Sequence, residues 1–199
     1  MRALSPIRGL LLIVGVGCLA TYGFVFGERA ASQAYAAWTF DRDLQQVAPL
    51  RLEGAQARRL PADSPHHSIV GRIWIPKLRL SAMVSEGDDA KTLRTAVGHI
   101  PSTPFPGQRG NVGVAAHRDT FFRRLGDLHT GDSIGFSTMD GEFTYEVESL
   151  RVVAPEDIEV LAPSQENVLT MVTCYPFFYI GNAPKRFIVR AKQTSGPGQ

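Results

Sequence analysis

The sequence predicts an all-β domain preceded by a membrane-spanning helix, and three observations lead to this fold class. No charged residue occurs between positions 9 and 27. From position 69 onward, short runs of alternating apolar and polar residues are separated by Gly, Pro or Asp, which is the pattern of strands and turns. Helical periodicity is scarce in that part of the chain. Many short strands with turn residues between them are typical of a closed β-barrel or a sandwich.

The composition narrows the class of protein further. The chain has 199 residues, enough for one domain plus appendages, and 44% hydrophobic and 20% charged residues are globular proportions. A net charge of +2 and the lack of a long basic run do not favour a nucleic-acid partner. The two cysteines are Cys18 and Cys174, and Cys18 lies in the apolar segment, so no disulfide framework is expected.

Residues 9–27 are predicted to form a transmembrane anchor. These nineteen residues make a helix of about 28 Å, roughly the thickness of the hydrocarbon core of a bilayer. Arg2 and Arg8 precede the segment and Glu28 follows it. The positive-inside rule then places residues 1–8 in the cytoplasm and the C-terminal domain outside. The expected location is therefore the cytoplasmic membrane, crossed once.

A cleaved signal peptide is the alternative interpretation of this segment, because Ala34-Tyr35-Ala36 resembles a cleavage site. The apolar run is longer than a usual signal core, however, and the candidate site lies well beyond its end. We therefore favour an uncleaved anchor.

Between the anchor and the β domain, residues 28–65 are expected to form a juxtamembrane helix and a linker. The first part, up to Gln46, is alanine-rich and carries aromatic residues suited to a membrane interface. From position 49 to 65 the periodicity is lost and Pro, Gly, Ala and Arg accumulate. The β domain is expected at 66–193, followed by a tail at 194–199.

Within this domain, the alternating runs predict strands at residues 69–75, 78–84, 111–116, 132–137, 142–153, 167–174 and 186–191. Helices are expected to be short. Residues 88–97 fit one helix with Asp88 or Asp89 as its N-cap, and residues 120–128 fit a turn or two.

Cys174 is the candidate nucleophile. It ends an apolar, β-branched run, and Pro176 prevents continuation of the strand, so the thiol is expected on a rigid element at the rim of the domain. The alternative is a buried, inert cysteine.

Thr173 points to the opposite face by strand alternation. We assign it as a candidate substrate-binding residue, and the alternative is an ordinary strand residue.

A cation is expected near this thiol. If residues 167–174 and 186–191 pair as antiparallel strands, the loop between them brings Lys185 and Arg186 close to Cys174. Strand alternation allows only one of the two cations on the face of the cysteine, and the pattern alone leaves the choice open. A guanidinium in this position could stabilise an oxyanion or hold a substrate carbonyl.

His117 is the candidate general acid and base, because it ends a strand-like run and an imidazole titrates near neutral pH. His99 follows a helical pattern, where a packing role is expected, and His129 lies in a turn. Asp119 could orient the imidazole, although an acidic residue before Thr120 is more often a turn or helix cap.

No cofactor and no metal are expected. The sequence has no phosphate loop, dinucleotide fingerprint or zinc-ligand spacing. His66 and His67 do not form a convincing metal pair, because adjacent side chains point apart in an extended chain and no carboxylate cluster accompanies them.

Taken together, these residues resemble the sortases, the membrane-anchored cysteine transpeptidases of bacteria, over about residues 69–192. The matching blocks are Gly110-Asn111-Val112, Ala116-His117-Arg118-Asp119-Thr120-Phe121-Phe122, Gly131-Asp132, Val172-Thr173-Cys174-Tyr175-Pro176-Phe177 and Ala183-Pro184-Lys185-Arg186-Phe187-Ile188-Val189. Their order and spacing are those of the family, and they are most similar to class D. Met171 replaces the leucine of the family's Thr-Leu-x-Thr-Cys signature, which nearly conserves volume. Ala116 stands where many relatives have glycine.

The resemblance implies a closed eight-stranded barrel with Cys174, His117 and Arg186 as the catalytic set, which selects Arg186 over Lys185. It implies that the Cys174 thiolate attacks a threonine carbonyl in an LPXTG-like C-terminal sorting signal and forms a thioacyl enzyme. His117 would protonate the leaving amine and later deprotonate an incoming amine, while Arg186 holds the substrate carbonyl or the oxyanion. The implied partners are exported proteins that carry such a signal and an amine acceptor at the cell envelope.

Two other functions fit the same residues. In a thiol hydrolase, water would resolve the acyl enzyme, so only the ratio of amide to acid product separates it from a transpeptidase. In a non-enzymatic, membrane-tethered peptide-binding barrel, Cys174→Ala would leave function intact. Three positions filled with the residue types that catalysis requires favour the enzyme.

Overall fold

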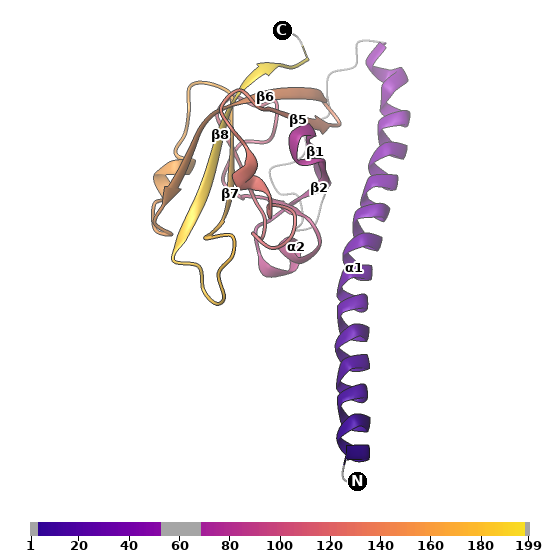
Figure 1. Ribbon diagram of the computed structural model, residues 1–199. Helices are drawn as coiled ribbons and strands as arrows, with labels where there is room; N and C mark the ends of the chain where they lie inside the picture. Colours follow the sequence, from indigo (N-terminus) through magenta and orange to yellow (C-terminus); the bar gives the residue numbers. More distant parts are fainter. Residues whose placement is uncertain (1–3, 53–68, 198–199) are drawn as a thin grey trace.

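A computed structural model describes residues 4–52 and 69–197 (Figure 1). They form a long N-terminal helix beside a β-barrel. The helices are α1 (Leu4–Leu52) and α2 (Ala90–Thr95), with 3-10 turns η1 (Pro76–Leu78), η2 (Leu125–Asp127) and η3 (Ile158–Leu161). The strands are β1 (Ile69–Ile75), β2 (Leu80–Glu86), β3 (Val97–His99), β4 (Asn111–Ala115), β5 (Ser133–Thr138), β6 (Gly141–Val153), β7 (Val168–Tyr175) and β8 (Lys185–Ser195).

The eight strands close into a barrel in the order β1-β2-β3-β4-β7-β8-β6-β5, which confirms the predicted fold class. β2 pairs with β3 and β4 pairs with β7 in parallel, whereas the other neighbours are antiparallel. Closure pairs the backbone groups of every strand on both sides, so the sheet has no free edge.

The wall of the barrel that matters for the site is formed by β4, β7 and β8. Along β4, Val112 and Val114 are buried in the core, and Leu169 and Met171 of β7 pack with them. Met171 is fully buried, so the methionine fills the core position that the family signature gives to leucine. By strand alternation, the residues between these positions face the outside of the barrel.

The sequence predicted β1 with its observed bounds, but it missed β3. Residues 97–99 were assigned to the end of a helix or to the segment after it, whereas they form a short strand parallel to β2. A Cβ on Gly98 would lie 2.3 Å from the carbonyl oxygen of Gly87, so the close approach of this strand requires glycine. The helix is shorter than expected, and Asp89 is its N-cap, accepting hydrogen bonds from the backbone of Lys91 and Thr92.

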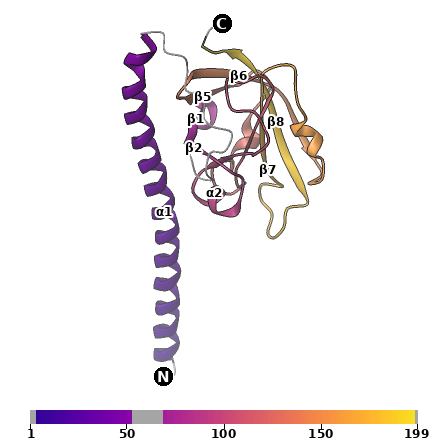
Figure 2. The same cartoon turned by 180° about the vertical axis from the view of Figure 1, so that it is seen from behind.

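The anchor and the juxtamembrane segment form one continuous helix, α1, which passes the expected start of the linker at Pro49 and ends at Leu52. Residues 53–65 of the predicted linker, and His66 and His67, lie outside the described residues. The apolar N-terminal part of α1 is long enough to cross a membrane, and most of it extends beyond the barrel (Figures 1 and 2). At the other end of the chain, β8 continues past the expected domain boundary at 193 to Ser195.

The second part of α1 is fixed to the barrel by specific contacts. The Gln33 side chain donates to the carbonyl oxygen of Thr95 at 2.8 Å and accepts from the backbone N–H of Met83 at 2.8 Å. Arg72 forms a 2.8 Å ion pair with Asp41. Phe40 is 1% exposed, so its ring is buried between the helix and the barrel. The orientation of the barrel relative to the apolar helix is therefore set by side-chain contacts.

Candidate active site

The strand register brings Cys174 and Arg186 together. β7 and β8 are antiparallel, as expected, and Cys174 lies directly opposite Arg186, with Tyr175 opposite Lys185. Residues directly opposite each other in an antiparallel pair project from the same face of the sheet. The choice that the sequence pattern left open is thereby resolved, because Arg186 shares the face of Cys174 and Lys185 does not.

His117 reaches the same place from the neighbouring strand. β4 runs parallel to β7 with Ala115 level with Val172, and the backbone N–H of Ala116 still donates to the Val172 carbonyl at 3.3 Å. His117 follows the end of β4 by two residues, and the register places that end of β4 beside the end of β7 that carries Cys174. All three side chains therefore lie at the same end of β4, β7 and β8, on the outer face of the barrel wall.

These three side chains are half-buried. One guanidinium nitrogen of Arg186 donates to the carbonyl oxygens of Ala183 and Lys185, at 3.2 and 3.0 Å. These bonds hold the guanidinium beside its own strand and leave its other N–H donors for a ligand. The arrangement joins a thiol, an imidazole and a permanent cation, which are the components of a thiol acyl-transfer site.

Thr173 has a different position from the one expected of a substrate-binding residue. Its side chain is 2% exposed and faces the barrel interior, where its hydroxyl donates to the carbonyl oxygen of Ala116 at 2.7 Å. Ala116 immediately precedes His117. The Thr173 hydroxyl therefore links the strand of the thiol to the strand of the imidazole.

Replacing Thr173 with valine is expected to lower kcat about tenfold with little change in KM, because the bond that fixes the residue before His117 is lost. Steady-state kinetics with an acyl donor would measure both constants. Thr173→Ser keeps the hydroxyl and should retain kcat. Equal losses in the valine and serine variants would contradict this positioning role.

The other threonine of the signature also ties β7 to β4. Thr170 is buried, and its hydroxyl donates to Oδ1 of Asn111 at 2.6 Å. The Asn111 amide in turn donates to the carbonyl oxygens of Val160 and Ala162, at 3.0 and 3.1 Å. This buried network holds the segment after β6 against the outer face of β4, near the start of the strand and away from the end that precedes His117.

Arg118 is a residue of the site that sequence reasoning missed. Its guanidinium donates to the carbonyl oxygens of Pro176, Tyr179 and Gly181 at 3.1, 2.8 and 2.9 Å. It also lies 5.7 Å from the centre of the Tyr179 ring. One side chain thus joins the segment of His117 to the loop between Cys174 and Arg186. The only sequence signal was its position directly after the histidine.

Arg118→Lys should loosen this loop, because an ammonium cannot reach three carbonyls with a planar fork of donors. Hydrogen exchange of the amides of residues 177–182 is expected to become about tenfold faster, which corresponds to the loss of about one charged hydrogen bond. Hydrogen-exchange mass spectrometry would measure it. Arg151→Lys, on the exposed face of β6, is the matched control. Unchanged amide exchange in Arg118→Lys would show that the three hydrogen bonds of the Arg118 guanidinium are not needed to order this loop.

The remaining candidates have structural roles or lie elsewhere. His99 is buried, with its Nδ1 2.7 Å from a Glu86 oxygen, in agreement with the packing role expected of it. Nδ1 of His129 lies 2.8 Å from the Lys77 ammonium nitrogen, in the turn before β5. Asp119 is exposed, and no hydrogen bond joins it to His117 within residues 4–52 and 69–197.

The fold and the site define a class of protein: a closed barrel with a cysteine, a histidine and an arginine at one end of adjacent strands. The Sortase domain family model matches residues 73–194. Sortase D of Bacillus subtilis (strain 168) is 39% identical over 126 residues, which are 63% of this chain and 64% of that protein. Sortase SrtE1 of Streptomyces coelicolor is 31% identical over 153 residues, 67% of this chain and 44% of that protein.

A solved structure of a Sortase D5 transpeptidase from Clostridium perfringens superimposes with a TM-score of 0.66. It is 24% identical, and the match covers 85% of this chain and 99% of that one, so this likeness concerns the fold. The chain belongs to the sortase family and is class D-like. It spans less than two thirds of the length of the two Bacillus and Streptomyces relatives.

Proposed function

We propose that this protein is a membrane-anchored cysteine transpeptidase. It cleaves an LPXTG-like C-terminal sorting signal through a thioacyl enzyme and joins the new carboxyl end to an amine acceptor. The observation that carries the proposal is the register that sets Cys174 opposite Arg186, with His117 at the adjacent end of β4. Membership of the sortase family supports it.

In the first half-reaction, the Cys174 thiolate attacks the carbonyl carbon of the signal's threonine. The N–H donors of Arg186 stabilise the oxyanion that forms. The C–N bond then breaks, and the imidazolium of His117 gives its proton to the leaving amine. The products are a thioester on Cys174 and a neutral imidazole.

In the second half-reaction, an incoming amine attacks the thioester carbonyl. The neutral His117 imidazole accepts a proton from this amine, so that the product is a neutral amide. The C–S bond breaks and returns Cys174 as a thiolate beside an imidazolium. The site thus regenerates itself without any cofactor.

The membrane location belongs to the same proposal. The apolar part of α1 would span the cytoplasmic membrane, with residues 1–8 inside and the barrel outside, where exported proteins emerge. Exported proteins that bear the signal and an amine at the cell envelope are the proposed partners. Contacts between α1 and the barrel, such as those of Gln33, support a barrel held close to the membrane.

Product analysis tests the transpeptidase against the hydrolase. The full chain in detergent or nanodiscs is mixed with LPXTG-like peptides and a panel of amines, and the products are identified by mass spectrometry. Amide-exchanged peptide, absent with Cys174→Ala, is the expected result. Hydrolysed acid alone, with every amine in the panel, would favour the thiol hydrolase. Peptide that is bound but never cleaved would favour the peptide-binding barrel.

A further inference from the structure

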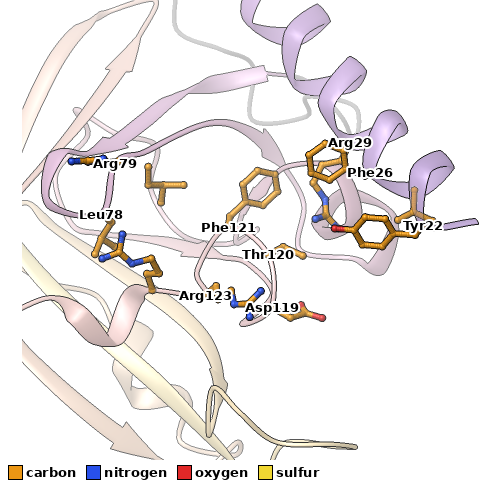
Figure 3. A pocket seen from close by; sticks show the side chains of 12 residues that line it. Tyr22, Phe26, Arg29, Leu78, Arg79, Asp119, Thr120, Phe121 and Arg123 are labelled. Carbon is orange, nitrogen blue, oxygen red and sulfur yellow. The ribbon is translucent and has the colours of Figure 1, made fainter. Parts of the chain in front are cut away.

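A pocket outside the active site lies between α1 and the barrel. It has a volume of about 620 Å³. Tyr22, Val25 and Phe26 line it from the helix, and Phe121 lines it from the turn that follows His117. Figure 3 shows the α1 side chains and Phe121 around the same space. One wall of the pocket is therefore the end of the apolar segment, and the other is the catalytic domain.

The charges that line this pocket are mostly basic. Arg29, Arg79, Arg123 and Arg124 contribute to the lining, against one carboxylate, that of Asp119. Arg124 forms an ion pair with Asp127, and Arg29 donates to a backbone carbonyl. Arg79 and Arg123 are exposed, and neither has a carboxylate partner in the part of the chain that the structure describes. Two guanidinium groups are thus free to bind an anion.

The height of this pocket along α1 indicates which class of anion it suits. Tyr22, Val25 and Phe26 belong to the last turns of the uncharged segment, and Glu28 and Arg29 are the first charged residues after it. Aromatic side chains at the end of a membrane span lie at the level of the lipid head groups. The arginines of the pocket then meet lipid phosphates, for which a guanidinium fork is suited.

A second, independent feature faces the same way. The loop between β7 and β8 exposes Phe178 and Ile180, which are 88% and 100% accessible, and half-exposes Tyr179. In both views this loop projects from the barrel in the direction of the N-terminal, apolar end of α1 (Figures 1 and 2). Exposed aromatic and aliphatic side chains beside a membrane span are suited to the bilayer interface.

We propose that the barrel docks on the surface of an anionic phospholipid membrane through these two features. Arg79 and Arg123 bind lipid phosphate, while the tip Phe178-Tyr179-Ile180 enters the interface. The inference rests on the membrane orientation given under the proposed function. Because the same loop connects Cys174 to Arg186, docking holds the active site at the lipid surface.

Depth measurements on the full chain test this docking. An environment-sensitive fluorophore is attached to Ile180→Cys in a Cys18→Ser/Cys174→Ala background, and the protein is reconstituted in vesicles. In vesicles with equal parts of phosphatidylglycerol and phosphatidylcholine, we expect a blue-shifted emission and protection from an aqueous quencher. In phosphatidylcholine alone, or at high salt, the protection should be lost. A label at Glu142→Cys, at the opposite end of the barrel, should stay accessible throughout.

The arginines are tested by Arg79→Gln/Arg123→Gln in the same labelled protein. Each basic residue at an anionic surface contributes about a fivefold preference, so the ratio of docked to undocked barrel should fall about 25-fold. Arg109→Gln/Arg151→Gln changes the net charge equally at exposed positions outside the pocket and should have no effect. The proposal would be overturned if the label at position 180 were equally accessible in the two lipid compositions. It would also be overturned if the label were equally protected in the Arg79→Gln/Arg123→Gln variant and in the Arg109→Gln/Arg151→Gln control. The readout does not depend on peptide transfer, so it fails or succeeds separately from the proposed activity.

Discussion

Cys174→Ala should abolish peptide transfer while the barrel remains folded. The thiolate is the only proposed nucleophile, and removing a nucleophile typically costs at least about 10⁴-fold in rate. The side chain is half-buried on the outer face of the wall and lies outside the hydrophobic core. Thermal unfolding should therefore change little. Turnover by mass spectrometry and a circular dichroism melt measure the two quantities.

Cys18→Ser is the matched control for this substitution. Cys18 lies in the apolar part of α1 and is exposed there, far along the chain from the site. Its replacement should leave turnover unchanged. Retained turnover in Cys174→Ala would contradict the acyl-transfer mechanism, because another group would then have to act as the nucleophile.

Arg186→Lys should lower kcat/KM by about 10² to 10³, even though the charge is conserved. The loss is comparable to the removal of one oxyanion-hole donor, because an ammonium cannot direct several fixed N–H groups toward the carbonyl while bonding the loop. Kinetics with a quenched fluorescent peptide would measure the effect. The effect should be mainly on kcat if Arg186 acts on the oxyanion.

Lys185→Gln provides the control for this cation. Lys185 lies opposite Tyr175, is exposed, and projects from the other face of the pair. We expect less than a threefold change in kcat/KM. A larger loss in Lys185→Gln than in Arg186→Lys would show that the register does not determine which cation acts.

The active-site wall was the part of the fold that the sequence described best. The β7 run is apolar or β-branched up to Cys174, and Pro176 terminates it, so its end could be placed closely. The pairing of β7 with β8 entered the sequence analysis as an assumption, and the structure confirms that it is antiparallel. The alternation of apolar and polar residues could not predict which side of the sheet the Arg186 side chain occupies, because alternation alone leaves the pairing register of the two strands uncertain by one residue.

Other parts depended on long-range contacts that local patterns do not report. β3 has three residues, too few to show alternation, and its place depends on Gly98 against Gly87. The positioning role of Thr173 required the carbonyl of Ala116, which is distant in sequence. The role of Arg118 required three carbonyls of a loop whose path only the folded chain defines.

The site and the proposed docking surface share one loop, and this has a mechanistic consequence. Arg118 ties the loop to the segment of His117, and the loop tip carries Phe178 and Ile180. The proposed contact with lipid and the geometry of the catalytic groups are therefore connected through the same backbone. Loss of the Arg118 hydrogen bonds and loss of lipid contact should both change the conformation of the loop between β7 and β8.

The most direct test of the acyl-transfer account is the mass of the enzyme itself during turnover. The full chain is incubated with an LPXTG-like peptide in the absence of an added amine, quenched in acid, and measured intact before peptide mapping. We predict an adduct equal to the acyl half of the peptide, located on Cys174, released by hydroxylamine and absent in His117→Ala. An enzyme that turns over the peptide while Cys174 stays unmodified under rapid quenching would contradict the thioacyl mechanism.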